Sequence, residues 1–215
     1  MRAKFDEQLN MLNQEMMHIG TMIEHSIQKA IEALVDQDVE LAKSIMDSDE
    51  EIDREQKKIE NLCFNLLMQQ QPVARDLRVI SAAMKMVTDM ERIGIQACEI
   101  AEIISVGNIE QATDKVDFQK ISDAVSNMVH MSLQAFGDKD MELANEVLKY
   151  DDVVDNLFCD IRSDLVSRLK AGSNDAEYLM DMMMIDKYFE RIGDHAVNIA
   201  KWVNFSITGE IEIVE

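Results

Sequence analysis

The sequence contains few of the residues that form tight turns, disulfide frameworks or β-sheets. Its 215 residues include one proline, seven glycines and three cysteines, and aromatic residues make up 5% of the chain. This composition disfavours an all-β or a doubly wound fold. The cysteines, Cys63, Cys98 and Cys159, are odd in number and far apart. That spacing argues against a disulfide framework and against a zinc site built from thiolates.

Positive charge is also scarce, because 21 basic side chains stand against 42 acidic ones and the formal net charge is −21. A surface this negative repels nucleic-acid phosphates and anionic lipid head groups, so we expect no nucleic-acid partner. The longest apolar run is four residues, 182–185, whereas a membrane-spanning helix needs about 20. The N-terminus has no apolar core after its basic residues, so we expect no secretory signal, no membrane insertion and a cytoplasmic location.

Apolar residues at three- and four-residue spacing are abundant, which is typical of amphipathic helices. Turn-forming residues interrupt this pattern and divide the chain into six expected helices. The expected helices span 3–36, 38–70, 73–106, 114–137, 139–171 and 174–206. Because short connections make neighbouring helices antiparallel, we predict an all-α protein built from two tandem three-helix bundles.

The second half of the sequence repeats the first. At an offset of 102 residues, the segment 38–42 aligns with 140–144. Beyond Pro72 the offset becomes 99, and the Glu-Arg-Ile-Gly segment at 91–94 coincides with the same four residues at 190–193. We therefore predict an internal duplication with domains over 1–107 and 108–215.

Acidic residues spaced four apart line single faces of several expected helices. Like charges at this spacing repel each other unless a cation lies on them, and carboxylates on facing helices build metal sites in bundles. The predicted metal ligands are Asp151, Asp155, Glu190 and Asp194, their first-half counterparts Asp49, Asp53 and Glu91, and two additional candidates, Asp186 and Asn198. Oxygen donors favour cations such as iron, manganese, magnesium or zinc, and the sequence does not select among them.

Other polar and small residues in these helices have more than one explanation. Gly94 and Gly193 each cost about 1 kcal/mol relative to alanine inside a helix, which indicates either close approach of a neighbouring helix or ligand, or a kink. His195 points about 100° away from Asp194 around the helix, so we expect a surface or core-edge residue. The sequence has no phosphate-binding loop, nucleophile elbow or paired His/Cys motif. We therefore expect no catalytic residues and no enzyme.

The sequence resembles the PhoU family, the bacterial accessory and regulatory proteins of phosphate-specific transport, over essentially its whole length. The resemblance rests on ERIGDHAVNIA at 190–200, on its partial copy DMERIG at 89–94, and on PVARDLR at 72–78. It implies a tandem pair of three-helix bundles. It also implies metal ions, including iron or zinc clusters, at an acidic residue and an Asp separated by three residues, a motif that matches Asp49–Asp53, Asp151–Asp155 and Glu190–Asp194.

One position departs from this motif. Ile95 stands where the family has Asp and where the second half of this chain has Asp194, so Glu91 lacks its partner. We expect the first-half site to be weaker, differently coordinated or absent, with Glu99 as a substitute ligand. The alternative is that Ile95 only widens the apolar stripe.

The resemblance implies a cytoplasmic negative regulator of the phosphate-starvation response and of phosphate uptake. It implies contacts with the ATP-binding cassette (ABC) phosphate transporter and with the sensor histidine kinase of the phosphate two-component system, and a homodimer. We favour a metal-binding adaptor. The alternatives are a metal-free helical scaffold and an enzyme that uses a carboxylate-bound metal to activate water.

Overall fold

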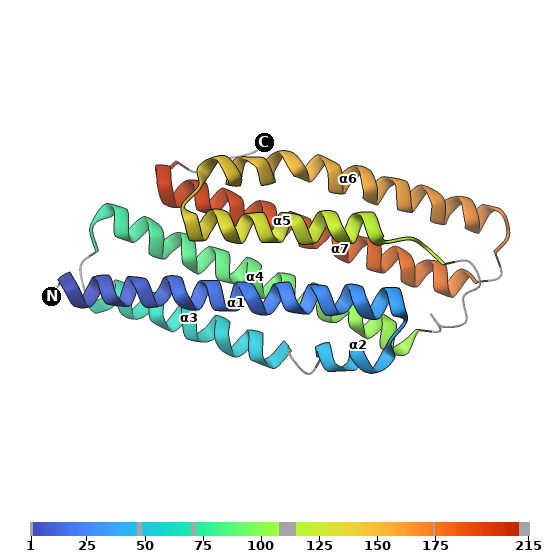
Figure 1. Ribbon diagram of the computed structural model, residues 1–215, viewed down its shortest axis with the longest axis horizontal. Helices are drawn as coiled ribbons and strands as arrows, with labels where there is room; N and C mark the ends of the chain where they lie inside the picture. The colour runs from blue at the N-terminus through green and yellow to red at the C-terminus, as the bar shows by residue number, and fades with distance from the viewer. Residues whose placement is uncertain (1, 47–48, 70–71, 108–114, 174, 211–215) are drawn as a thin grey trace.

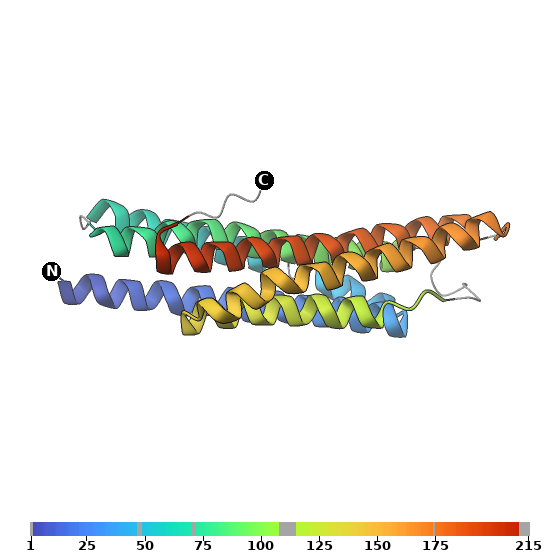
Figure 2. The ribbon, with the colours of Figure 1, turned by 90° about the horizontal axis from the view of Figure 1, so that it is seen from above.

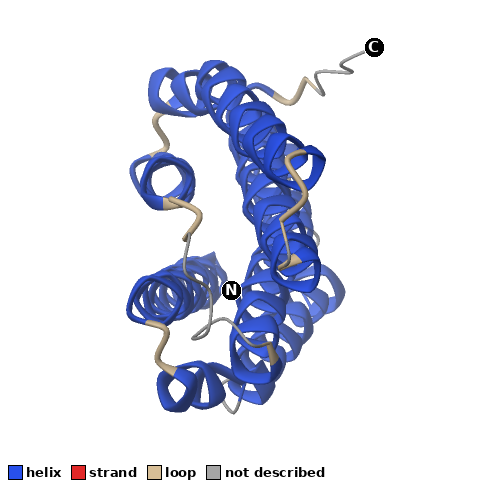
Figure 3. Cartoon of the chain, turned by 90° about the vertical axis from the view of Figure 1, so that its right-hand side faces the viewer, coloured by secondary structure: helices blue, strands red, loops and turns tan. Residues whose placement is uncertain are grey.

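The computed structural model describes residues 2–46, 49–69, 72–107, 115–173 and 175–210. These residues form helices and connecting loops and contain no β-strand (Figures 1 and 3). The helices are α1 (Arg2–Asp36), α2 (Val39–Met46), α3 (Asp49–Gln69), α4 (Ala74–Val106), α5 (Gln119–Asp138), α6 (Met141–Lys170) and α7 (Ala176–Thr208). None of the helices described is apolar over a length that would cross a bilayer.

The predicted all-α tandem architecture is confirmed. Helices α1, α3 and α4 contact one another and carry α2 at one end, and α5, α6 and α7 form the second bundle. The two bundles lie side by side in an elongated molecule (Figures 1 and 2). They are joined mainly where α4 packs against α7, with a smaller contact between α1 and α5.

Two of the predicted helices differ from the structure. The helix expected over 38–70 is described as α2 and α3, on either side of residues 47–48, which lie outside the described residues. The helix expected from residue 114 begins at Gln119 instead. Before it, the amide of Val116 donates to the Tyr178 hydroxyl at 3.1 Å, and Phe118 packs against Phe189 with 6.0 Å between ring centroids. These tertiary contacts hold the chain out of the helix.

The turns that precede α2 and α6 are two copies of one structure. Gln37 and Lys139, which are 102 residues apart, both adopt the left-handed conformation with φ of 56°. The next residues, Asp38 and Asp140, each accept a hydrogen bond from the amide of the third residue of the following helix, at 2.9 and 3.0 Å. A side-chain acceptor at this place satisfies an amide that has no partner within the helix. The duplication seen in the sequence is therefore also present in the backbone.

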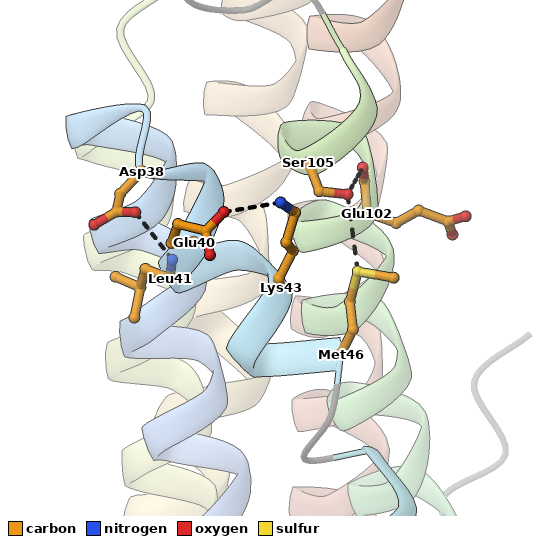
Figure 4. Close-up of polar contacts among 7 residues, drawn as sticks. All are labelled: Asp38, Glu40, Leu41, Lys43, Met46, Glu102 and Ser105. Atoms are coloured by element: carbon orange, nitrogen blue, oxygen red, sulfur yellow. Dashed lines mark hydrogen bonds and ion pairs between the residues drawn. The ribbon is translucent and has the colours of Figure 1, made fainter.

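Helix α2 is a short helix held against α4. Lys43 pairs with Glu40 at 2.8 Å on its exposed side, and the Ser105 hydroxyl of α4 lies 3.8 Å from the Met46 sulfur (Figure 4). Ala42 and Ile45 are fully buried. The apolar side of α2 thus closes one end of the first bundle.

The glycines of α4 and α7 lie where a neighbouring helix approaches closely. A Cβ atom on Gly94 would lie 2.9 Å from Cδ1 of Ile52 in α3, and one on Gly193 would lie 3.4 Å from Cγ1 of Val154 in α6. Ile52 and Val154 occupy equivalent positions in the two halves. Close helix approach, one of the two explanations drawn from the sequence, therefore accounts for Gly94, whereas at Gly193 an added methyl group would make an ordinary contact.

These distances predict different outcomes for two equivalent substitutions. Gly193→Ala should raise the free energy of unfolding by up to about 1 kcal/mol, because the helix backbone favours alanine and the new methyl group makes an ordinary contact. Gly94→Ala should raise the free energy of unfolding by less, or should lower it, because Ile52 must move. Urea unfolding followed by circular dichroism measures both changes. A Gly94→Ala protein as stable as Gly193→Ala would contradict the packing difference.

Candidate functional site

Helices α6 and α7 place three of the predicted ligands within range of one another's charges. Burial raises the pKa of Asp151 to about 6, and the charges of Asp155 and Asp194 raise it in the same direction. The pKa of Asp194, a residue largely open to solvent, is raised first by the partial desolvation of its carboxyl group, then by the charge of Glu190, and to a smaller extent by that of Asp155. The neighbouring carboxylates therefore make ionisation of Asp151 and Asp194 less favourable. This is the arrangement that a bound cation would stabilise.

Glu190, the fourth member of this group, already has a cationic partner. Lys187, one turn earlier on α7, donates to a Glu190 carboxylate oxygen at 2.5 Å. The same ammonium lies 5.4 Å from the ring centroid of Phe158 on α6. A metal ion bound by Glu190 would therefore share this carboxylate with the lysine or displace the lysine.

Asp186 is buried in the protein interior. Its side chain is fully buried, and neither carboxylate oxygen has a hydrogen-bond partner among the described residues. Burial, followed by the charge of Glu190, raises the pKa of Asp186 to about 8, so the neutral acid predominates at pH 7. Val87, the equivalent residue of α4, is also fully buried. Asp186 is thus an acidic residue at a core position, whereas Asp194 is exposed.

In the first half, a lysine pairs with one of the predicted ligands. Lys57 donates to Asp53 at 2.6 Å. This bond, together with the charges of Asp53 and Glu91, raises the pKa of Lys57. The equivalent residue in the second half is Cys159, which is exposed and carries no cationic group. The two halves therefore differ in charge balance at equivalent carboxylates.

Asp49 lies beside Cys98 of α4. Burial raises the pKa of the Cys98 thiol to about 12, and the charge of Asp49 and its hydrogen bond act in the same direction. Ile95, the residue that replaces the expected Asp, is half-buried. Asp49 thus lies near a thiol that donates to the Ile45 carbonyl at 3.7 Å, and Asp53 pairs with a lysine.

Asn198, an additional candidate, and Glu99, the expected substitute ligand, contact the opposite repeat. The Asn198 amide donates to Asp89 of α4 at 3.2 Å, and the Tyr188 hydroxyl of α7 donates to Glu99 at 3.0 Å. His195 Nδ1 lies 2.9 Å from the same Asp89 oxygen. We call this contact between α4 and α7 the seam.

Sequence reasoning missed Asp89 and Tyr188, and it placed His195 at a surface or core edge. The histidine side chain is 17% exposed and that of Asp89 is 15% exposed. The sequence contained one indication that these two residues are related: Asp89 and Tyr188 occupy equivalent positions before the repeated Glu-Arg-Ile-Gly segment.

Within the part of the chain that the structure describes, no group of three or more His, Cys, Asp or Glu side chains is arranged to hold a metal ion. The carboxylates of α6 and α7 interact through their charges but are not gathered around one point. The metal site therefore stays a prediction.

The fold defines a class, the all-helical proteins made of two tandem three-helix bundles. The family model of the PhoU domain matches residues 16–104 and 118–203, one match in each bundle. This chain belongs to the PhoU family.

The relatives match nearly the whole chain. A protein of Clostridium acetobutylicum named phosphate-specific transport system accessory protein PhoU homolog is 36% identical over 211 residues, covering 97% of this chain and 96% of the relative. A protein of the same name from Pseudomonas putida is 31% identical, over 96% of this chain and 81% of its own length. The crystal structure of PhoU from Pseudomonas aeruginosa superposes with a TM-score of 0.92 at 30% identity, covering 96% of this chain and all of that one.

The buried acid predicts how stability depends on pH. Because Asp186 keeps its proton in the folded state up to about pH 8 and loses it near pH 4 when unfolded, the unfolded state binds fewer protons in this interval. Asp186 should therefore lower the free energy of unfolding as pH rises from about 4 to 8, by on the order of 1 kcal/mol per pH unit.

Asp186→Asn and Asp186→Val should both remove this slope, and Asp186→Val, which copies Val87, should be the more stable protein above pH 7. Urea unfolding at several pH values, in buffer with a chelator, gives the difference from wild type. Parallel pH profiles for the wild type and both variants would rule out a buried neutral acid at this position.

Proposed function

We propose that this chain is a cytoplasmic accessory protein of a phosphate-specific transport system and a negative regulator of phosphate uptake and of the phosphate-starvation response. The observation that carries the proposal is the near full-length match to relatives named as such accessory proteins. Both tandem bundles take part in the match, so the whole architecture is shared rather than one domain.

The partners we propose are the ABC phosphate transporter and the sensor histidine kinase of the phosphate two-component system. Opposite charge on two surfaces favours association and speeds encounter, so a chain of net charge −21 would contact basic patches on these partners. We also propose that the chain acts as a homodimer.

We further propose that the α6–α7 carboxylates bind a divalent or trivalent cation. The support is the oxygen-only donor set and the mutual repulsion of Asp151, Asp155 and Asp194, with no lysine at the position equivalent to Lys57. A cation would offset that repulsion and favour ionised carboxylates. Because the present arrangement holds no ready-made ligand group among the described residues, binding would require these side chains to converge.

Equivalent substitutions in the two halves test this cation site. Asp155→Ala should lower the metal bound per chain, and Asp194→Ala should do the same. Asp53→Ala, the matched first-half control, should retain most of the metal because Lys57 already neutralises Asp53. Elemental analysis after purification without chelator, with circular dichroism to confirm helicity, measures the effect. Full metal content in the Asp155→Ala and Asp194→Ala proteins would show that the metal binds elsewhere in the chain, and a wild-type chain without metal would favour the metal-free scaffold.

A reporter strain tests the regulatory role. Deleting the gene should switch on alkaline phosphatase in phosphate-replete medium, and the wild-type chain should restore repression. If the cation site takes part, the Asp155→Ala/Asp194→Ala chain should fail to repress while accumulating normally, and Asp53→Ala should repress. A deletion strain that keeps the reporter silent would contradict the regulatory role. Repression by the double variant would remove the site from the mechanism.

A further inference from the structure

The polar contacts of the seam come in a pair related by the internal duplication. Asn198 of α7 donates to Asp89 of α4, and Tyr188 of α7 donates to Glu99 of α4. The offset of 99 residues converts Asp89 into Tyr188 and Glu99 into Asn198. Each contact therefore joins the same two positions of the repeat, as in a two-fold symmetric dimer in which residue i meets j and j meets i.

The chemistry of the seam is one-sided although its geometry is symmetric. Both acidic acceptors, Asp89 and Glu99, belong to α4, and the residues that contact them, Tyr188, His195 and Asn198, belong to α7. The charge of a third α4 acid, Glu102, also acts on Tyr188. The α4 face thus presents carboxylates, and the α7 face presents neutral donors and an imidazole.

Because the two faces differ in chemistry, pairing two α4 faces is less favourable than pairing an α4 face with an α7 face. If two α4 faces met with this geometry, Asp89 of each would face Glu99 of the other, and two pairs of carboxylates would be desolvated together. Like charges placed this way cost energy that no donor offsets. Unlike faces instead form charge-assisted hydrogen bonds, which are about twice as strong as neutral ones.

We propose that the seam selects the unlike repeat: the carboxylates of the α4 face make it accept an α7 face and reject a second α4 face, so that the two repeats of one chain close on each other. The duplication supplies the geometry of a symmetric dimer. The two faces differ at three equivalent positions, which are Asp89, Gln96 and Glu99 in α4 and Tyr188, His195 and Asn198 in α7. These differences give the two faces different partners.

Full-length variants that exchange the two faces test this inference. The first variant gives α7 the residues of α4, with Tyr188→Asp, His195→Gln and Asn198→Glu. The second gives α4 the residues of α7, with Asp89→Tyr, Gln96→His and Glu99→Asn. The third carries all six substitutions, so that each donor again meets an acceptor but on opposite helices. Thermal unfolding and size-exclusion chromatography are measured on all three.

The first variant should unfold on the order of 10 °C below wild type, because it loses hydrogen bonds to charged groups and places carboxylates face to face. The second should lose about half as much, because its facing groups are uncharged. The six-fold variant should recover at least half of the loss of the first. If the first variant does not fold, the other two still decide the matter.

A six-fold variant no more stable than the first, or a second variant that loses as much as the first, would overturn selection by charge. Either result would mean that side-chain packing specific to each helix, and not the placement of charge, determines the contact at the seam.

Discussion

The packing of α4 against α7 is the contact on which the rest of the structure depends. Each of these helices is the third helix of its own bundle and also the main link to the other. They must therefore be apolar on more than one side, and Ile93 and Ile192, in the repeated Glu-Arg-Ile-Gly segment, are both fully buried. Next to Ile93, Gly94 leaves room for Ile52 of the bundle partner α3. The repeated segment thus serves two interfaces within a few residues.

The two halves agree where the backbone needs a particular conformation and differ where charge decides the partner. The Asp caps and left-handed residues that precede α2 and α6 are matched. Val87 and Asp186, or Lys57 and Cys159, occupy equivalent positions with opposite chemistry. Exchange of single side chains on a shared scaffold left Asp53 paired with Lys57 in one half. In the other half the charges of Asp155 and Asp194 act against ionisation of Asp151, and Lys201 offsets them in part.

Local patterns in the sequence predicted the helices, the turns and the duplication, because amphipathic spacing, caps and glycines act within a few residues. They did not predict where α5 begins, since Val116 and Phe118 contact α7 residues about 60 to 70 positions further along the chain. Nor did they assign Asn198 and Glu99 to the seam. Helical periodicity shows which residues share a face, but it does not show which helix that face meets.

The candidate carboxylates and the seam adjoin each other along the chain. Asp194 precedes His195 and lies one turn before Asn198, and both of these contact Asp89 in the first repeat. Asp49 lies beside Cys98, which precedes Glu99, the acceptor for Tyr188 of the second repeat. A cation held by Asp194 would add positive charge beside the residues that contact Asp89. The α7 face carries the donors, so a cation there would reinforce the charge difference between the faces, whereas one beside Glu99 would weaken it.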